Sequence, residues 1–310
     1  MNSRGFSKKT GKDGCCMKDI HTPKHNHLAM SCILSAGSLW GCMGLFSRGI
    51  AALGISVTSV AVIRNLGACL LMALFFLLTD RSIFRVKLLH LPLFLAIGVG
   101  SVLMMTLFYF RSQQESSLAV AAILLYTAPT FVVILSAVLF KNKITRQKLT
   151  ALVIAFLGCS FVTGIWSGGL KVTALGLALG LGSGFCYALY TIIGQFGLRH
   201  YQPFTVTFYS LLFAGIGSLF FWNAQEMAVI AASPKGLLLS LGLMLFSTVL
   251  PYLLYTKGLS ALGDSSKASI LASVEPVVAA IVGILAFGEP MTIGVLLGLA
   301  CILISVYILR

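Results

Sequence analysis

Ten stretches of about 20 mostly apolar residues follow one another along this chain, with short polar connections between them. A helix rises about 1.5 Å per residue, so each stretch is long enough to cross the ~30 Å hydrocarbon core of a bilayer. Because no water can satisfy exposed backbone groups in that core, the spans must be helical. The sequence therefore predicts an all-α integral membrane protein with helices at about 28–49, 56–79, 92–110, 117–140, 149–165, 175–198, 204–222, 236–255, 268–287 and 291–309.

Composition favours a membrane protein and disfavours other classes. The chain is 58% hydrophobic and 10% charged, whereas a soluble domain is roughly half apolar and a quarter charged. The net charge is +14, but its Lys and Arg residues sit in short segments between apolar spans, so no nucleic-acid partner is predicted. Of eight cysteines, six lie singly within apolar spans, which is typical of small buried hydrophobes rather than a disulfide framework.

The positive residues also predict the orientation of the helices. Seventeen of the 22 Lys and Arg residues lie on the side of the N-terminus, in residues 1–27, 80–91, 141–148, 199–203 and 256–267 and at Arg310. Four lie on the other side, namely Arg48, Arg111, Lys171 and Lys235. Cytoplasmic connections carry an excess of positive residues, so we expect a multi-pass protein of the cell membrane with both termini in the cytoplasm.

The span at 268–287 carries an acid and a proline inside its apolar run, Glu275 and Pro276. A carboxylate in hydrocarbon costs several kcal/mol, so Glu275 should face protein or a water-filled cavity rather than lipid. Pro276 donates no backbone hydrogen bond and displaces the carbonyl of Ala272, which breaks the helix. An acid beside broken backbone at membrane depth is typical of a substrate pathway.

The chain also resembles itself after a shift of 147 residues. The shift places Pro129 on Pro276, Phe140 on Phe287, Thr145 on Thr292 and Trp40 on Tyr187. A unit of five helices crosses the membrane an odd number of times, so its copy must be inserted upside down. The repeat therefore predicts two inverted five-helix units, at 28–165 and 175–309, as in many secondary transporters.

The fourth and ninth spans, which end in FKNKIT and FGEPMT, resemble the EamA repeat of the drug/metabolite transporter superfamily. The resemblance covers about 28–309, and its most specific part is VEPVVAAIVGILAFGEPMT. It implies ten helices and a small-molecule carrier, often an exporter of amino acids or other metabolites. The family's Gly-Glu pair stands here as Gly288-Glu289, whereas the first half has Lys141-Asn142, so no role for that acid is implied in the first half.

Glu275 and Arg64 are the deep charges of the predicted bundle. Burial disfavours an ionised carboxyl group, so Glu275 is a candidate for proton coupling as well as for substrate binding, or it stabilises the break beside Pro276. Arg64 lies about eight residues below the outer end of its span, too deep to reach water by simple extension. Its guanidinium is a candidate ligand for a carboxylate or phosphate, and direct pairing with Glu275 is the structural alternative.

Aromatic residues with polar tips recur within the spans and are candidates to line an amphipathic pocket. They are Trp40, Tyr109, Tyr126, Tyr187, Tyr209 and Tyr252, each of which is otherwise explained by packing or by the interfacial belt. Three prolines within spans, Pro129, Pro251 and Pro276, are expected to break their helices and are candidate hinges.

Two stripes of small residues predict close helix packing, either within the bundle or between the subunits of a homodimer. They are Gly176, Gly180 and Gly184 in one span and Gly294 and Gly298 in another. The basic tail, residues 1–27, is expected to be a disordered cytoplasmic segment without a signal peptide. Its Cys15, Cys16, His21, His25 and His27 lack the usual ligand spacing, so no metal site is predicted.

These features favour a secondary transporter that moves a small molecule across the bilayer by alternating access, with proton coupling through Glu275. The alternatives are an integral membrane enzyme and a flippase for lipid-linked substrates. No H-E-x-x-H motif, Ser-centred elbow or phosphate-binding Gly loop is present, and His90 and His200 lie in connections. The sequence therefore predicts neither an enzyme nor a cofactor, and it leaves the substrate open.

The charge pattern predicts the outcome of cysteine labelling in intact cells. In a background free of native cysteines, a cysteine at position 171 should react with a membrane-impermeant reagent, because it lies outside. A cysteine at position 143 should be protected, because it lies among the positive residues of the cytoplasmic side. The reverse pattern would overturn the predicted orientation.

Overall fold

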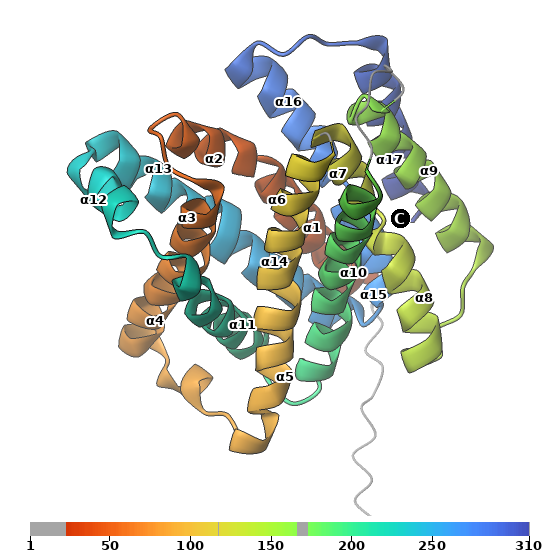
Figure 1. The fold of residues 1–310 in the computed structure, drawn as a ribbon. Coiled ribbons are helices and arrows are strands. Elements are labelled where there is room, and N and C mark those ends of the chain that lie inside the picture. Colours follow the sequence, from red (N-terminus) through yellow and green to blue (C-terminus); the bar gives the residue numbers. More distant parts are fainter. Residues whose placement is uncertain (1–22, 117, 166–172, 310) are drawn as a thin grey trace, which may run out of the picture.

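The computed structural model describes residues 23–116, 118–165 and 173–309, and every regular element among them is helical (Figure 1). Successive helical stretches, each made of one or more helices, run in alternate directions between two ends of a bundle. We call the end at which α1 begins, at Pro23, the tail end, and the end at which α2 finishes, at Ala51, the far end. The predicted tail, residues 1–27, lies almost wholly outside the described residues.

The helices of the first half match the first five predicted spans. They are α1 (Pro23–Gly41), α2 (Met43–Ala51), α3 (Val57–Val62), α4 (Ala68–Thr79), α5 (Leu91–Leu95), α6 (Met104–Glu115), α7 (Leu118–Leu125), α8 (Ala128–Phe140) and α9 (Arg146–Val162). Two π-helical segments, Ile63–Gly67 and Ala96–Leu103, join α3 to α4 and α5 to α6.

The second half repeats this plan with one addition. Its helices are α10 (Ala174–Gly197), α11 (Pro203–Ser218), α12 (Ala224–Ala232), α13 (Pro234–Met244), α14 (Leu250–Leu262), α15 (Ser265–Ala272), α16 (Glu275–Phe287) and α17 (Ile293–Ile308). A π-helical segment, Leu245–Val249, joins α13 to α14. The short α12 was not predicted, because it lies in a connection between spans; Glu226 ties it to α3 by accepting from the Ser56 backbone N–H at 2.9 Å.

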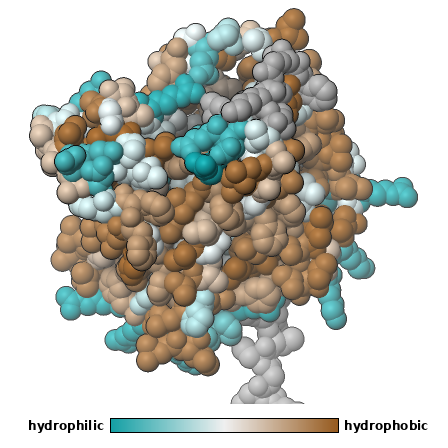
Figure 2. Space-filling view, viewed as in Figure 1, coloured by the Kyte–Doolittle hydropathy of each residue, from teal (hydrophilic) through white to brown (hydrophobic). Residues whose placement is uncertain are grey.

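Eight helical stretches in the described part of the chain are long and apolar enough to cross a membrane. The helices predicted fifth and tenth, α9 and α17, are shorter, with 17 and 16 residues. Large apolar side chains cover the outside of the bundle, among them Leu78, Phe220 and Leu285, each at least 80% exposed. Figure 2 shows them as a brown belt with hydrophilic residues concentrated at its two ends. Such a belt is suited to lipid, because exposing an apolar surface of this size to water would be unfavourable.

Two of the helical stretches are broken at the same repeat position. The break between α7 and α8 falls at residues 126–127, and the break between α15 and α16 falls at 273–274, 147 residues later. Pro129 and Pro276 each occupy the first turn of the helix that follows. A proline fits there because the first backbone N–H groups of a helix have no partner within it.

The sequence FGEPMT, and its first-half equivalent FKNKIT, is a helix end followed by a helix start. Gly288 has a φ of +66° at the end of α16, and Lys141 has a φ of +56° at the end of α8. This left-handed conformation suits glycine and strains lysine. Thr292 and Thr145 then accept the backbone N–H groups of Val295 and Lys148, both at 3.2 Å, and so cap α17 and α9.

The first helix of each half packs against helices of the other half. Helix α1 of the first half packs against α14 and α16 of the second, and α10 of the second half packs against α6 and α8 of the first. Helices α9 and α17 pack against each other. Neither half therefore buries its own apolar faces alone, and the bundle is a single packed unit.

Glycines allow the unbroken helices to approach the breaks. A Cβ atom on Gly184 of α10 would lie 2.7 Å from the Leu124 carbonyl oxygen, and one on Gly37 of α1 would lie 2.8 Å from the Ala272 carbonyl oxygen. These two glycines are 147 residues apart, so the first helix of each half packs against the broken helix of the other half in the same way.

The small-residue stripes also pack inside the bundle. Gly176 and Gly180 face Ser112, Ser116 and Leu124, and Gly298 of α17 faces the backbone of Gly158 in α9. The stripes are thus used for packing within the chain, and a homodimer remains a prediction without structural support.

We predict that Gly184→Ala lowers the free energy of unfolding by about 1–3 kcal/mol, because its methyl group must push the backbone of the break. Gly194→Ala, nearly three turns further along α10, is the matched control, since nothing lies within 4 Å of a Cβ atom there. That variant should be neutral or more stable by up to about 1 kcal/mol. Thermal unfolding of the purified variants measures both changes. Equal effects at the two positions would contradict this account of the break.

Candidate functional site

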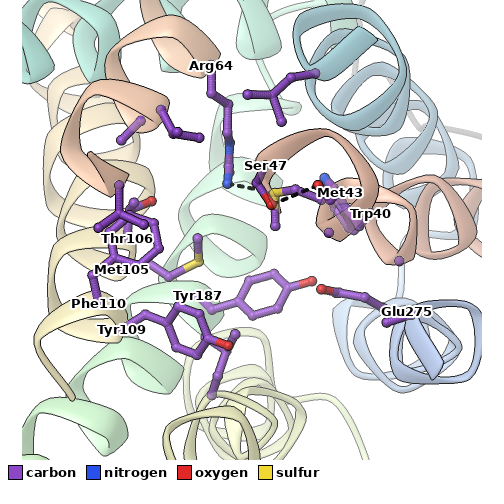
Figure 3. Close-up of a pocket in the computed structure, with 18 of the residues that line it drawn as sticks. Trp40, Met43, Ser47, Arg64, Met105, Thr106, Tyr109, Phe110, Tyr187 and Glu275 are labelled. Carbon is purple, nitrogen blue, oxygen red and sulfur yellow. Dashed lines mark hydrogen bonds between the residues drawn. The ribbon is translucent and has the colours of Figure 1, made fainter. Parts of the chain in front are cut away.

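A cavity of about 390 Å³ lies between the two halves of the bundle (Figure 3). At the far end it reaches Arg48 and Phe287, whose side chains are partly exposed. Towards the tail end it stops at Trp40, Tyr190 and Tyr252, each at most 6% exposed. The cavity is therefore open towards the far end and closed towards the tail end.

Arg64 enters this cavity from the π-helical segment Ile63–Gly67 and is 7% exposed. Its Nη2 donates to the Tyr252 hydroxyl at 2.9 Å, and its Nη1 lies 3.3 Å from the Met43 sulfur. Its Nε has no hydrogen-bond partner among the described residues. A hydroxyl and a thioether do not neutralise a buried cation, so this side chain retains the capacity to bind an anion.

Glu275 enters the same cavity from the first turn of α16, directly after the break. Figure 3 shows its carboxylate and the Tyr187 hydroxyl pointing at each other. A carboxylate in the first turn of a helix is stabilised by the partial positive charge of that terminus. A Cβ atom on Gly41 would lie 2.6 Å from the Glu275 carbonyl oxygen, so α1 holds this backbone closely.

Arg64 and Glu275 do not pair directly. The ion pairs between described residues are Arg48–Glu289, Arg111–Glu115 and Lys148–Asp264. Figure 3 shows the guanidinium and the carboxylate approaching the cavity from different sides, with Met43 beside the guanidinium and Tyr187 beside the carboxylate. The two charges thus face a shared space rather than each other.

All five other residues predicted for the site line this cavity: Trp40, Tyr109, Tyr126, Tyr187 and Tyr252. The Trp40 ring contacts three tyrosine rings at centroid distances of 6.3 Å (Tyr187), 5.4 Å (Tyr252) and 5.4 Å (Tyr255). Tyr209, also singled out in the sequence, lies elsewhere and donates to the Phe84 carbonyl oxygen at 3.0 Å. The tyrosines form an amphipathic wall, suited to stacking and to hydrogen bonding.

Several lining residues were not identified from the sequence. They include Met43, Ser47, Met105, Gln113 and Tyr190. Helical spacing offers a signal for two of them, because Gln113 lies one turn after Tyr109 and Tyr190 one turn after Tyr187. The two methionines carry no such signal, since apolar residues fill every span.

Pro129 and Pro276 follow breaks between two helices, whereas Pro251 follows a π-helical segment. It lies in the first turn of α14, directly after the π-helical segment Leu245–Val249. The equivalent region of the first half is the π-helical segment Ala96–Leu103, which contains no proline. All three prolines therefore lie beside irregular backbone, and their role as hinges stays a prediction.

The contacts between the two halves differ at the two ends of the bundle. At the far end, Arg48 bonds Glu289 at 2.6 Å and lies 4.7 Å from the centre of the Phe287 ring, beside the open cavity. At the tail end, Arg199 lies 5.2 Å from the centre of the Phe140 ring, the repeat equivalent of Phe287. The tail end has in addition the ion pair Lys148–Asp264 at 2.6 Å.

No group of three potential metal ligands occurs among the described residues. The candidates Cys15, Cys16 and His21 lie outside the described part of the chain. The six cysteines within it, at positions 32, 42, 69, 159, 186 and 301, are all free thiols.

Comparison with known proteins gives the same picture over nearly the whole chain. The EamA-like transporter family matches residues 27–164 and 174–310. An uncharacterised transporter of Archaeoglobus fulgidus is 29% identical over 276 residues, which are 89% of this chain and 94% of that protein. The threonine/homoserine exporter RhtA of Escherichia coli is 30% identical over 69% of each chain.

A solved crystal structure supports the fold independently. It superposes with a TM-score of 0.74 over 90% of this chain and 95% of that chain, at 16% sequence identity. Together with the two matched repeats and the apolar helices, these likenesses identify a multi-pass membrane protein and a transporter rather than an enzyme. The chain belongs to the EamA-like transporter family, within the drug/metabolite transporter superfamily.

Proposed function

We propose that this protein is a secondary transporter that exports amino acids or closely related amphipathic solutes. The observation that carries the proposal is a buried Arg64 that has no carboxylate partner among the described residues, in the same cavity as Glu275. A zwitterion is complementary to this pair, because its carboxylate can meet the guanidinium and its amine can meet the carboxylate. The name of the similar exporter RhtA, for threonine and homoserine, agrees with this class of solute.

We propose proton coupling through the same carboxylate. Glu275 can hold a substrate amine or a proton, but a protonated carboxyl group offers no negative charge to an amine. A proton that enters from outside would then displace the solute, which gives exchange of proton for solute. Tyr187, whose hydroxyl faces Glu275, would hydrogen-bond the carboxyl group in either state.

Two inverted five-helix repeats, at 28–165 and 175–309, give this exchange a mechanism. The helix breaks coincide after a shift of 147 residues, and α1 and α10 pack on corresponding helices of the opposite half. Trp40 and Tyr187 are equivalent under that shift, and their rings touch at 6.3 Å. Two equivalent residues that touch must lie close to the two-fold axis that relates the repeats. Because Trp40 and Tyr187 both line the cavity, this axis would pass through the cavity.

We assign the tail end to the cytoplasm and the far end to the outside of the cell membrane, from the distribution of positive residues. The structure then corresponds to an outward-open state with ten membrane helices. Return to the inward-open state requires Lys148–Asp264 to separate and the far end of the cavity to close. Partly exposed ion pairs are weak enough to break in each cycle.

We predict that Arg64→Gln and Glu275→Gln each reduce amino-acid transport into proteoliposomes by about thirty-fold or more. Losing one charge from a desolvated, hydrogen-bonded contact costs roughly 2–5 kcal/mol. Both variants should remain folded at normal abundance, because the two side chains do not pair directly. Wild-type transport by either folded variant would remove that residue from the site.

Arg111→Gln and Glu115→Gln are the matched controls. They remove the same charges from an ion pair of 2.8 Å on the surface of α6, outside the lining of the cavity, and should transport normally. If Arg64 and Glu275 instead stabilise the fold together, each single variant should lose stability strongly and the double variant should recover it.

A further inference from the structure

A second cavity, of about 500 Å³, opens at the tail end. It lies between the connection that joins α4 to α5 and the connection that follows α10. Four basic residues line it, Arg85, Lys87, His90 and His200, and none of the described residues in its lining is acidic. It shares no residue with the transport cavity.

Tyr201 holds the two connections together at the centre of this cavity. Its hydroxyl oxygen accepts the backbone N–H of Lys87 at 3.0 Å and lies 2.7 Å from Nδ1 of His90. The His90 and His200 rings face each other at a centroid distance of 5.0 Å. The basic side chains therefore project from backbone that is fixed across the two halves of the chain.

Apolar side chains flank the cavity on the outside. Leu88 and Leu89, in the same connection, are 81% and 84% exposed. Leu78, near the end of α4 from which this connection starts, is 80% exposed. Exposed leucines thus adjoin the basic cavity at the tail end of the bundle, which is the arrangement expected at the level of lipid headgroups.

We propose that this cavity binds the headgroup of an anionic phospholipid. Arg85 and Lys87 supply charge to the phosphate, and the two imidazoles supply hydrogen-bond donors. The acyl chains lie against Leu88 and Leu89, which a free phosphate ion would leave exposed. The lipid would join the first half to the second at the tail end, and this role is independent of which solute the protein carries.

The test is native mass spectrometry of the purified full chain, titrated with phosphatidylglycerol and, separately, with phosphatidylcholine. We expect the wild type to retain at least one phosphatidylglycerol in preference to phosphatidylcholine. The double variant Arg85→Gln/Lys87→Gln should bind that lipid about thirty-fold more weakly, as expected for the loss of two cations near a membrane surface. The double variant Lys143→Gln/Arg146→Gln removes the same charge from exposed positions at the same end, outside the cavity, and should bind normally.

Thermal unfolding with millimolar inorganic phosphate separates the two sources of the anion. The proposal expects phosphatidylglycerol to raise the melting temperature of the wild type and inorganic phosphate to leave it unchanged. Equal stabilisation by inorganic phosphate, equal binding of phosphatidylcholine, or equal losses in both double variants would overturn it. If the first double variant does not fold, the single variant Lys87→Gln should still weaken lipid binding, by about five-fold.

Discussion

Arg64 brings a positive charge into the interior of the bundle, where its partners in the described part of the chain are a tyrosine hydroxyl and a thioether and not a carboxylate. An ion that is buried without a counter-ion costs several kcal/mol in a low-dielectric interior. If apolar side chains filled the space around Arg64, nothing would offset this free-energy cost. An open cavity that also receives Glu275 lowers the cost through water, through the opposite charge and, in the cycle that we propose, through a bound solute. The position of the cavity, its polar tyrosine wall and its extension to the far end all follow from that requirement.

The scaffold around the two charges is repeated, whereas the charges are not. The repeat equivalent of Glu275 is Ala128, and that of Arg64 is Leu211. The helix breaks, the glycines that seat them and the capping threonines occur in both halves. In the cycle that we propose, this repeated scaffold gives each end of the bundle the same means of opening. In the same proposed cycle, Arg64 and Glu275, whose repeat equivalents are uncharged, would supply one anion site and one cation site at fixed places in the cavity.

Apolar span length, the mid-span prolines and the internal shift were sufficient to predict the helical bundle, because lipid permits little else. Arg64 and Glu275 stood out because charges are rare at membrane depth. Their separation was not predictable, since side-chain reach is as large as the uncertainty of a helix end. The π-helical segment that carries Arg64 has no proline or other local signal, and its equivalent in α11 is regular. Met43, Met105 and α12 depend on tertiary packing, which single-residue patterns do not encode.

The central claim is that one cavity between two inverted repeats opens to each side in turn. Pulsed dipolar spectroscopy tests it with spin labels at residues 51 and 291 of the far end and at their repeat equivalents, residues 198 and 144, at the tail end. A proton gradient and a transported amino acid should shorten the first distance and lengthen the second in the same fraction of molecules. Two distances that stay fixed, or that change in the same sense, would contradict alternating access through this cavity.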